Sequence, residues 1–356
     1  MDNKQRTLRV RFELRLLALP LGLALVLAAS GCEKGRAAAS SGPTEGALEL
    51  LELRYQGAAG QVTFPELAAD LGYLAPVKLV HVGNTISGPQ DVQTVATGDT
   101  DFGGAFNGAI LNLVARKAPI RAVIGLSSVD AETFSGFYVR QDSTLASAHD
   151  LIGKKIAMNT LGAHHEFVLR EYLRRAGLTK QEVERVALVA LPPVNTEQAL
   201  RAGQVDVAVL GGIHREKALE RGGVRPLFSD FELFGQMTSA SYVVSERLLR
   251  AHPKTVQKFV AGTARAIEWS RATPREQVIA RMQNIIHKRG RAEDASLVRY
   301  FRAVRSETRG GVLTDAQFQR WIDWLVRDGQ LKQGQLEPAL VYTNELNPYA
   351  TGEPTF

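Results

Sequence analysis

The chain has 356 residues, of which 45% are hydrophobic and 22% charged, so it can build two domains of ordinary size with proper cores. Its formal net charge is +6, but residues 1–31 supply five positive and two negative side chains, which leaves about +3 for the remainder. We find no cluster of Lys and Arg interleaved with aromatic residues. Composition and charge therefore argue against a nucleic-acid partner.

The first 31 residues have the pattern of a secretory signal peptide. Residues 1–15 are rich in Arg and Lys, and residues 16–30 read LLALPLGLALVLAAS, an apolar stretch that contains Pro20 and ends in small residues. The stretch is too short to cross a membrane comfortably as a helix. This order of basic, apolar and small residues favours an export signal over a short membrane anchor or a buried core helix.

The end of this segment, Ala29-Ser30-Gly31-Cys32, resembles the lipobox at which bacterial prolipoproteins are lipidated and cleaved, with Ala29 in place of the usual leucine. Cys32 is the only cysteine in the chain, so it cannot form an intramolecular disulfide. Two acyl chains on one residue anchor a protein stably. Residues 32–48 are mostly small and polar, as in a flexible tether. The sequence thus predicts an exported lipoprotein that faces the periplasm or the cell exterior and is attached to a membrane through Cys32.

Beyond the tether, strand-like and helix-like patterns alternate. Helices are predicted at 65–74, at 90–96 and from Asn107, and strands at 51–56, 77–84, 100–106 and 121–128. Such alternation is typical of parallel strands joined by crossover helices.

A second block of the same kind follows FYVRQD (137–142). It contains predicted strands at 154–160, 185–191 and 205–212 and helices at 165–177 and 197–202. After a strand at 239–245 the chain becomes almost wholly helical, with apolar faces on 253–272 and around Trp321 and Trp324. The predicted fold class is α/β, with two mainly parallel sheets flanked by helices and a helical C-terminal region.

Four sequence segments occur in a characteristic order: GDTDFGGA (98–105), DLIGKKIAM (150–158), EQALRAGQVDVAVL (197–210) and SERLLRAHPKTVQKFV (245–260). Together they resemble the solute-binding proteins of nitrate-, sulfonate- and taurine-type ABC importers, a family also similar to the thiamine-pyrimidine-precursor binders. The resemblance covers about residues 50–290. It implies a two-lobed periplasmic-binding-protein fold of type II, whose lobes close on a solute by hinge motion.

The resemblance also implies a domain organisation and a set of partners. Lobe 1 would comprise 49–138 and 243–356 and lobe 2 would comprise 139–242, with crossings near Phe137–Arg140 and Ser239–Val243. The expected partners are a small-molecule solute and an ABC permease and ATPase complex, besides the membrane reached through the lipid on Cys32. We expect a monomer with no cofactor.

The candidate site follows from the topology. In open α/β sheets, ligands bind beyond the carboxyl ends of the strands, where helix N-termini present unpaired amides that favour anions. In the first lobe this rule selects Gln56, Gly57, Asn84, Thr85, Ala105, Phe106 and Asn107. In the second lobe it selects Asn159, Thr160, Leu161, Gly162, Gly212, Ile213 and His214. For single residues such as Asn107 or Thr160, helix capping is an equally good explanation. As a set they predict a pocket for a small anionic or heteroaromatic solute.

Histidine, aromatic and arginine side chains are the other candidates for ligand contacts. His164 and His165 are neighbours on a predicted helix, point about 100° apart and have no cysteine partner, so we predict no metal site. Phe106, Phe134, Phe137 and Tyr242 could form an aromatic wall, although such residues more often pack in a core. The predicted loops hold no Arg that would clamp a sulfonate or carboxylate bidentately, which weakens the sulfonate assignment.

The two alternative functions are an enzyme and a solute sensor. The pyrimidine-synthase relatives share the fold, but they use a cysteine-rich iron motif that this chain cannot supply. Gly153-Lys154-Lys155 lacks the rest of a phosphate-binding loop, and there is no Gly-x-Ser-x-Gly elbow, so we predict no enzymatic activity. A two-lobed lipoprotein that senses its solute without transporting it stays open. Neighbouring genes for a permease and an ATPase would favour the importer.

Overall fold

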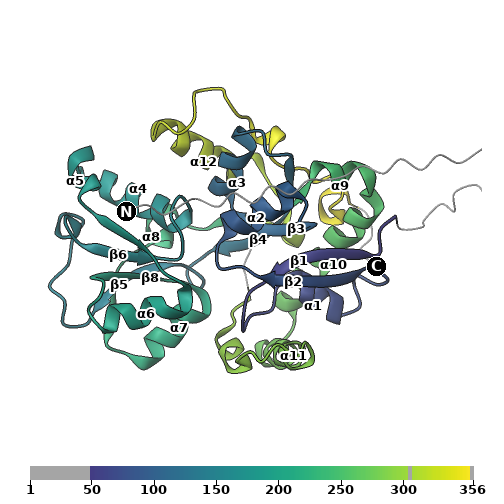
Figure 1. Cartoon of the computed structure of the whole chain (residues 1–356), viewed down its shortest axis with the longest axis horizontal. Coiled ribbons are helices and arrows are strands. Elements are labelled where there is room, and N and C mark those ends of the chain that lie inside the picture. Colours follow the sequence, from purple (N-terminus) through teal and green to yellow (C-terminus); the bar gives the residue numbers. More distant parts are fainter. Residues whose placement is uncertain (1–48, 304–306, 353–356) are drawn as a thin grey trace, which may run out of the picture. The chain divides into compact units, whose positions relative to one another are not determined.

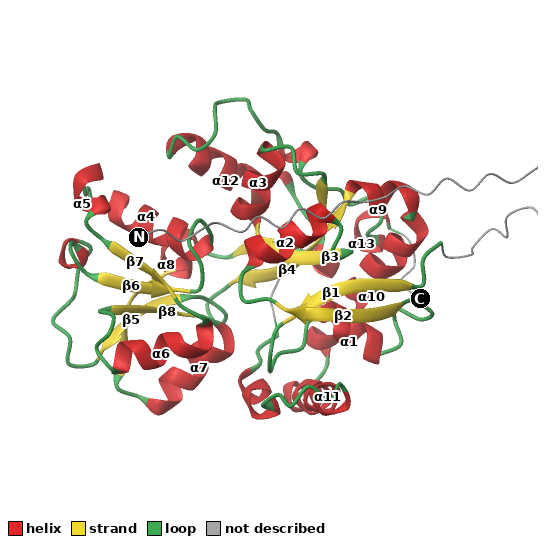
Figure 2. Ribbon diagram, viewed as in Figure 1, coloured by secondary structure: helices red, strands yellow, loops and turns green. Residues whose placement is uncertain are grey.

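The chain passes twice between two groups of strands. A computed structural model describes residues 49–303 and 307–352 (Figure 1), so the predicted signal peptide, Cys32 and the whole predicted tether lie outside the described residues. We call residues 136–234 the second lobe and the other described residues the first lobe. In Figure 2 the strands of each group lie between helices, as expected for an α/β fold.

The first lobe begins with alternating strands and helices, close to the predicted positions. The elements are β1 (Glu52–Gly57), α1 (Phe64–Asp70), β2 (Lys78–Asn84), α2 (Gly88–Thr97), β3 (Phe102–Phe106), α3 (Asn107–Ala115) and β4 (Ile120–Val129). Helix α1 starts at a capping box, because Thr63 and Glu66 each accept the other's backbone N–H. Helix α2 ends at Gly98, whose left-handed backbone (φ 87°) suits glycine.

The second lobe is built around one five-stranded sheet with the order β7-β6-β8-β5-β9. Its elements are β5 (Gly136–Arg140), η1 (His149–Leu151), β6 (Lys155–Met158), α4 (His164–Arg175), α5 (Lys180–Glu184), β7 (Ala187–Ala190), α6 (Pro193–Arg201), β8 (Val207–Leu210), α7 (Gly212–Arg221), β9 (Val224–Ser229) and α8 (Asp230–Phe234). All four residues of β8 are buried, which explains the continuous apolar run VAVL.

The chain returns to the first lobe through β10 (Met237–Ser245), which lies between β3 and β4 and is antiparallel to both. In the second lobe β5 likewise runs antiparallel to β8 and β9. The two-stranded sheet β1-β2 is parallel, the three-stranded sheet β3-β10-β4 has only antiparallel pairs, and the five-stranded sheet is mixed. The sheets are thus less parallel than predicted, because the strands that follow each passage between lobes run against their neighbours. The passages lie at 130–135 and 235–236, slightly before the predicted crossings, which fall inside β5 and β10.

The C-terminal region is helical, as predicted. Its elements are α9 (Glu246–Ala251), α10 (Pro253–Ala272), α11 (Arg275–Lys288), η2 (Ala295–Tyr300), η3 (Arg309–Gly311), α12 (Asp315–Arg327), η4 (Pro338–Leu340) and α13 (Pro348–Thr351). Helix α10 packs on α1, and α12 packs on α3. Helix α12 also reaches the second lobe, since the rings of Trp324 and Phe167 of α4 lie 4.4 Å apart.

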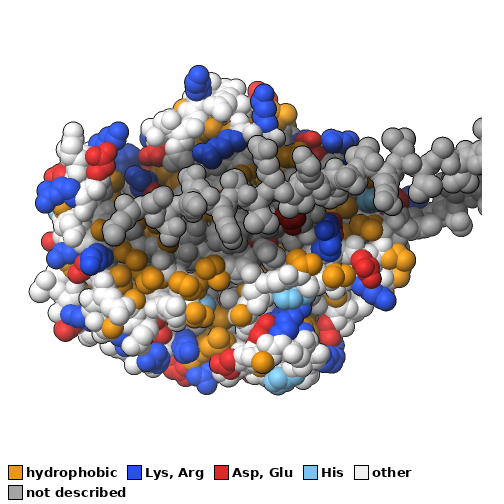
Figure 3. All heavy atoms as spheres, viewed as in Figure 1, with side chains coloured by type: hydrophobic (Ala, Val, Ile, Leu, Met, Phe, Trp, Pro, Cys, Tyr) orange, Lys and Arg blue, Asp and Glu red, His pale blue; other side chains and the backbone are white. Residues whose placement is uncertain are grey.

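Two surface properties bear on function. On the face shown in Figure 3, positive and negative side chains are interspersed, without a broad basic patch of the kind that nucleic acid requires. None of the helices in the described part of the chain has the length and apolar character needed to cross a membrane.

Candidate functional site

A pocket of about 490 Å³ lies where the chain passes between the lobes. This volume is in the range of small-molecule sites. The first lobe contributes Phe106, Ser127, Ser128, Val129, Ser239 and Ala240 to its wall, together with Tyr300, Phe301 and Arg302 from the C-terminal region. The second lobe contributes the starts of α4, α6 and α7 and the end of β8. The pocket thus has walls from both lobes.

The passage at 130–135 is shaped by Asp130. The Oδ1 atom of Asp130 accepts hydrogen bonds from the backbone N–H groups of Glu132 and Thr133, both at 2.7 Å, and its own N–H donates to Thr133 O at 2.8 Å. Aspartate closes tight turns in this way. The turn brings Glu132, Thr133 and Phe134 into the pocket wall.

The start of α4 supplies two histidines that face different partners. The Nε2 atom of His164 lies 2.7 Å from Oδ2 of the fully buried Asp230, whose Oδ1 accepts the N–H of Ser135. The Nε2 atom of His165 lies 3.3 Å from Ser135 Oγ. Burial, with a smaller contribution from His164, lowers the pKa of His165 to about 3. His165 is therefore a neutral hydrogen-bonding group at physiological pH.

This arrangement does not form a Ser-His-Asp relay. In such a relay one histidine bridges the serine and the carboxylate, so that the carboxylate orients the base. Here His165 contacts Ser135 while His164 contacts Asp230. In addition, the low pKa of His165 makes it a weak base. The geometry suits hydrogen bonding to a ligand better than activation of a nucleophile.

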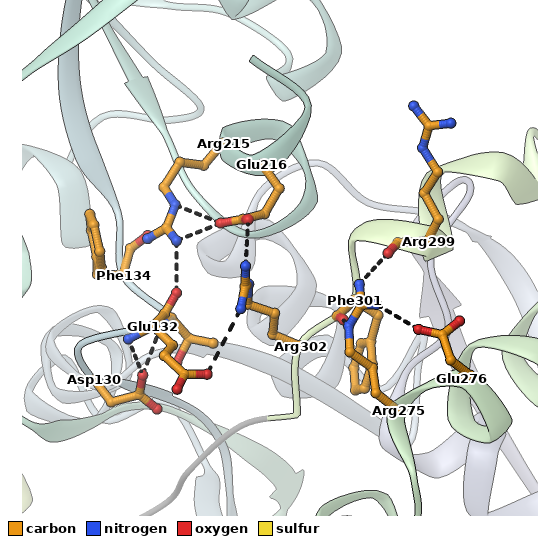
Figure 4. Close-up of polar contacts among 11 residues, drawn as sticks. Asp130, Glu132, Phe134, Arg215, Glu216, Arg275, Glu276, Arg299, Phe301 and Arg302 are labelled. Atoms are coloured by element: carbon orange, nitrogen blue, oxygen red, sulfur yellow. Dashed lines mark hydrogen bonds and ion pairs between the residues drawn. The ribbon is translucent and has the colours of Figure 1, made fainter. Parts of the chain in front are cut away.

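Arg215 is a buried arginine on α7 that lines the pocket and contacts several protein groups (Figure 4). Arg215 donates from Nη1 to Phe134 O at 3.1 Å, from Nη2 to Glu132 O at 2.7 Å and from Nε to Glu216 Oε1 at 3.0 Å. Its guanidinium also lies 3.8 Å from the centre of the Phe134 ring. Arg302 pairs with Glu216 at 3.0 Å and lies 3.9 Å from Glu132. Both arginines of the wall are thus already engaged by protein groups.

Five of the fourteen predicted contacts line the pocket: Phe106, Asn159, Gly212, Ile213 and His214. Phe106 also packs on His164 and Trp321, with ring centres 4.7 and 4.6 Å apart. Burial lowers the pKa of His214, which keeps this side chain neutral. The rule that ligands lie beyond strand ends works best after β8, where Gly211 and Gly212 open α7.

The other first-lobe candidates lie outside the pocket wall. Gln56, Gly57, Asn84 and Thr85 are together at the ends of β1 and β2, where Gly57 pairs with Asn84 and Thr85 N donates to Gly57 O. Ala105 and Asn107 are buried. Asn107 does not cap α3: its Oδ1 accepts from Ser241 Oγ at 2.7 Å, and its Nδ2 donates to Thr238 O at 3.3 Å. Its amide is committed to the protein interior.

In the second lobe, Thr160, Leu161 and Gly162 precede α4 without lining the pocket. Thr160 Oγ1 lies 3.4 Å from Ser87 Oγ and so joins the loops of the two lobes. Gly162 N–H donates to Glu166 Oε2 at 2.8 Å. Of the predicted aromatic wall, Phe106 and Phe134 line the pocket, whereas Phe137 stacks on Phe228 and Tyr242 packs among Phe102 and Phe259 in the core.

The sequence missed several wall residues. Glu132, Thr133 and Ser135 lie in the first passage, whereas the others lie on β4, α8 and β10 or after η2: Ser127, Ser128, Asp230, Ser239 and Arg302. The Asp-x-x-Thr spacing at 130–133 is a turn signal that could have marked the first passage. Within residues 49–303 and 307–352, no group of three or more His, Cys, Asp and Glu side chains could hold a metal ion.

Known proteins provide relatives for this fold. The chain is 26% identical over 198 residues to a Brucella abortus (strain 2308) protein named "Putative binding protein", covering 54% of this chain and 57% of that relative. The alignment therefore spans little more than half the length of the relative.

Solved structures match over more of the chain. The periplasmic aliphatic sulphonate binding protein SsuA from Escherichia coli has a TM-score of 0.62 and 21% identity, covering 84% of this chain and 93% of that chain. The periplasmic nitrate-binding protein NrtA from Synechocystis PCC 6803 has a TM-score of 0.64 and 13% identity, covering 84% and 88%. The desulfurization enzyme DSZB has a TM-score of 0.56 and 19% identity, covering 85% and 99%.

These likenesses confirm the predicted periplasmic-binding-protein fold. An enzyme shares it, so the fold alone does not define the activity. The family itself is shown by sequence, because residues 68–277 match the model described as NMT1/THI5 like. The chain belongs to the NMT1/THI5-like family.

Proposed function

We propose that the chain is an extracytoplasmic binding protein that captures one small solute in the pocket between its lobes and delivers it to an ABC importer. The observation that carries the proposal is the pocket itself, which has walls from both lobes and lies beside the two passages of the chain. Rotation of one lobe about such passages opens and closes a site without disturbing either core.

The names of the relatives support this proposal. The Brucella relative is named as a binding protein, and the structures of SsuA and NrtA belong to periplasmic proteins that bind sulphonate and nitrate. Because DSZB is an enzyme, its structural likeness makes an enzymatic activity the alternative function. The separate Ser135–His165 and His164–Asp230 pairs favour binding, because neither pair links a nucleophile to an oriented base.

The direct test is solute binding without turnover. The purified full-length chain is screened by thermal shift against sulfonates, nitrate, taurine, pyrimidines, aromatic acids and their amides, and each hit is measured by titration calorimetry. We expect one solute per chain and unchanged solute after overnight incubation, as analysed by mass spectrometry. Conversion of any hit to a product would show an enzyme instead.

We also propose that Cys32 carries a lipid that keeps the binder near its permease, which raises the local concentration of the loaded protein. Metabolic labelling with a fatty acid should mark the wild-type chain but not a Cys32→Ser variant, and the variant should leave the membrane fraction. If deletion of the gene does not reduce uptake of the identified solute, the sensing role replaces transport.

A further inference from the structure

Among the described residues of the pocket wall, no cation is left unpaired to hold an anion. The described wall includes the arginines Arg215 and Arg302, and both are paired with Glu216 (Figure 4). Oxyanions are recognised most strongly by a guanidinium that offers two parallel N–H groups. In Arg215, Nε and both Nη atoms already donate to Glu216 or to the carbonyls of Glu132 and Phe134.

The sum of the charges points the same way. Among the described residues, the wall holds three carboxylates, from Glu132, Glu216 and Asp230, against two guanidinium groups. Asp230 is fully buried, and the Glu216 side chain is 17% exposed. An anion here would lie close to the buried carboxylates of Asp230 and Glu216, and this repulsion offsets the preference of the helix N-termini for negative charge.

The wall does offer neutral groups that seek partners. Ser128 Oγ, Thr133 Oγ1, His164 Nδ1 and His165 Nδ1 are buried atoms without a hydrogen-bond partner in the described part of the chain, and all four residues line the pocket. Ser128 is only 7% exposed. Buried polar atoms in native proteins nearly always have a partner, so a group without one at a pocket wall marks a ligand contact.

The His164 ring is held in place on one side only, because its Nε2 lies 2.7 Å from the carboxylate of Asp230 and its Nδ1 has no partner among the described residues. Helix α7 starts at Gly212 and its cap residue Gly211 has no side chain, so the first amides of α7 remain as donors. A complementary solute presents a carbonyl-type acceptor to the amides and polar N–H or O–H groups to the unpartnered hydroxyls of Ser128 and Thr133.

We infer that this pocket selects an uncharged polar solute, carrying both a carbonyl oxygen and an N–H or O–H group, in preference to a sulfonate, nitrate or carboxylate. The inference rests on the proposed function and narrows it. It separates this chain from the sulphonate- and nitrate-binding proteins that share its fold.

The test uses pairs of compounds that differ in charge but not in shape. Nicotinamide and nicotinate, benzamide and benzoate, and orotamide and orotate are titrated into the purified full-length chain at pH 7.5, beside ethanesulfonate, taurine and nitrate. We expect the neutral member of a pair to bind at least about tenfold more tightly than its acid. Tighter binding of an acid or an oxyanion overturns the inference while leaving solute capture intact. If no compound of either class binds, both the inference and the proposed function are contradicted.

A second arm examines the neutral groups themselves. Ser128→Ala and Thr133→Val each remove one unpartnered hydroxyl and should weaken the tightest neutral compound by about 5- to 20-fold. Thr144→Val is the matched control, because Thr144 is exposed and lies outside the pocket wall. All three variants should keep the wild-type melting temperature within a few degrees. Unchanged affinity in both pocket variants would show that these hydroxyls do not contact the solute.

Discussion

Arg302 and Glu216 form an ion pair beside the pocket, with Nη2 of the arginine 3.0 Å from Oε2 of the carboxylate. Arg302 follows η2 in the first lobe, and Glu216 lies on α7 in the second. One helical turn further along α7, Glu220 contacts Tyr300 and Arg299. The segment 299–302 therefore fastens the first lobe to the second at the mouth of the site.

Replacing Arg302 with Ala should weaken solute binding. The side chain is 44% exposed, and exposed ion pairs contribute at most about 1 kcal/mol, so we expect an affinity loss of about two- to fivefold. The loss should lie mainly in a faster dissociation rate, because the pair is made when the lobes are together. Stopped-flow measurements with the identified solute would show it.

Arg250→Ala is the matched control for that variant. Arg250 is an exposed arginine paired with Glu246 at 3.2 Å on α9, outside the pocket wall. It should bind solute like the wild type. High salt should reduce the difference between wild type and Arg302→Ala, because salt screens exposed charges. Equal dissociation rates for Arg302→Ala and Arg250→Ala would contradict the fastening role.

Glu171 should stabilise the contact between α4 and α12 in a pH-dependent way. Its carboxylate is 3% exposed and pairs with Arg174 at 2.7 Å, Arg175 at 2.8 Å and Arg327 of α12 at 3.7 Å. Burial alone would raise the pKa of Glu171, but the hydrogen bonds from Arg174 and Arg175 outweigh it and lower the pKa to about 2. The stabilisation is therefore present above about pH 4.5 and is lost as pH falls toward 2.

Glu171→Gln should thus lower the free energy of unfolding by about 2 kcal/mol at pH 7, as measured by urea denaturation. The difference from wild type should shrink between pH 4.5 and pH 3. Glu184→Gln is the control, because Glu184 is 62% exposed and lies 3.9 Å from Lys180. A difference that stays constant down to pH 3 would argue against an ionised Glu171 as its source.

Much of the fold was accessible from the sequence. The spacing of apolar residues located β1 to β4, α2 and α10, because each has one clear periodicity. Some also have a clear end, such as Gly98 after α2. The strand β9, with Pro226 inside it, was missed because proline usually argues against a strand. The antiparallel setting of β5 and β10 depends on contacts between residues 70 or more positions apart, which no local pattern encodes.

The site was only partly accessible. Glycines after a buried strand led to Gly212, Ile213 and His214, which begin α7 and line the pocket. Asn107 resembled a helix cap in sequence, yet tertiary packing turned its amide toward Ser241 and Thr238. Arg215 directly follows the predicted residue His214, and its role as a structural residue follows only from its contacts with Glu132, Phe134 and Glu216.

Asn107→Ala should destabilise the first lobe. The fully buried amide satisfies the Ser241 hydroxyl and the Thr238 carbonyl of β10, and its loss leaves both without that partner. We expect a loss of about 1–3 kcal/mol in the free energy of unfolding. Asn112→Ala on the same helix is the control, since Asn112 makes an exposed contact with Gln330. Equal stability of the two variants would show that the buried amide is dispensable.

Asp91 should make the wild-type protein less stable as pH rises. It is 6% exposed at the start of α2, where Oδ2 accepts the N–H of Gly104 at 2.7 Å, and Oδ1 has no partner among the described residues. Burial raises the pKa of Asp91 from 3.8 to about 7, although the Gly104 amide opposes the shift. The folded state thus holds its proton more tightly than the unfolded state does. The resulting stabilisation is complete below about pH 3.8 and is lost as pH rises through 7.

Asp91→Asn keeps an acceptor for Gly104 and removes the buried charge, so it should be more stable than the wild type at pH 8, by about 2 kcal/mol. The gain should fall steadily as the pH is lowered to 4.5 and should be absent in Asp142→Asn, because the Asp142 side chain is 77% exposed. Urea unfolding of the three proteins at pH 4.5, 6 and 8 measures these differences. A variant less stable than the wild type at pH 8 would mean that the ionised carboxylate is well solvated or paired in the fold, contrary to its buried position between α2 and β3.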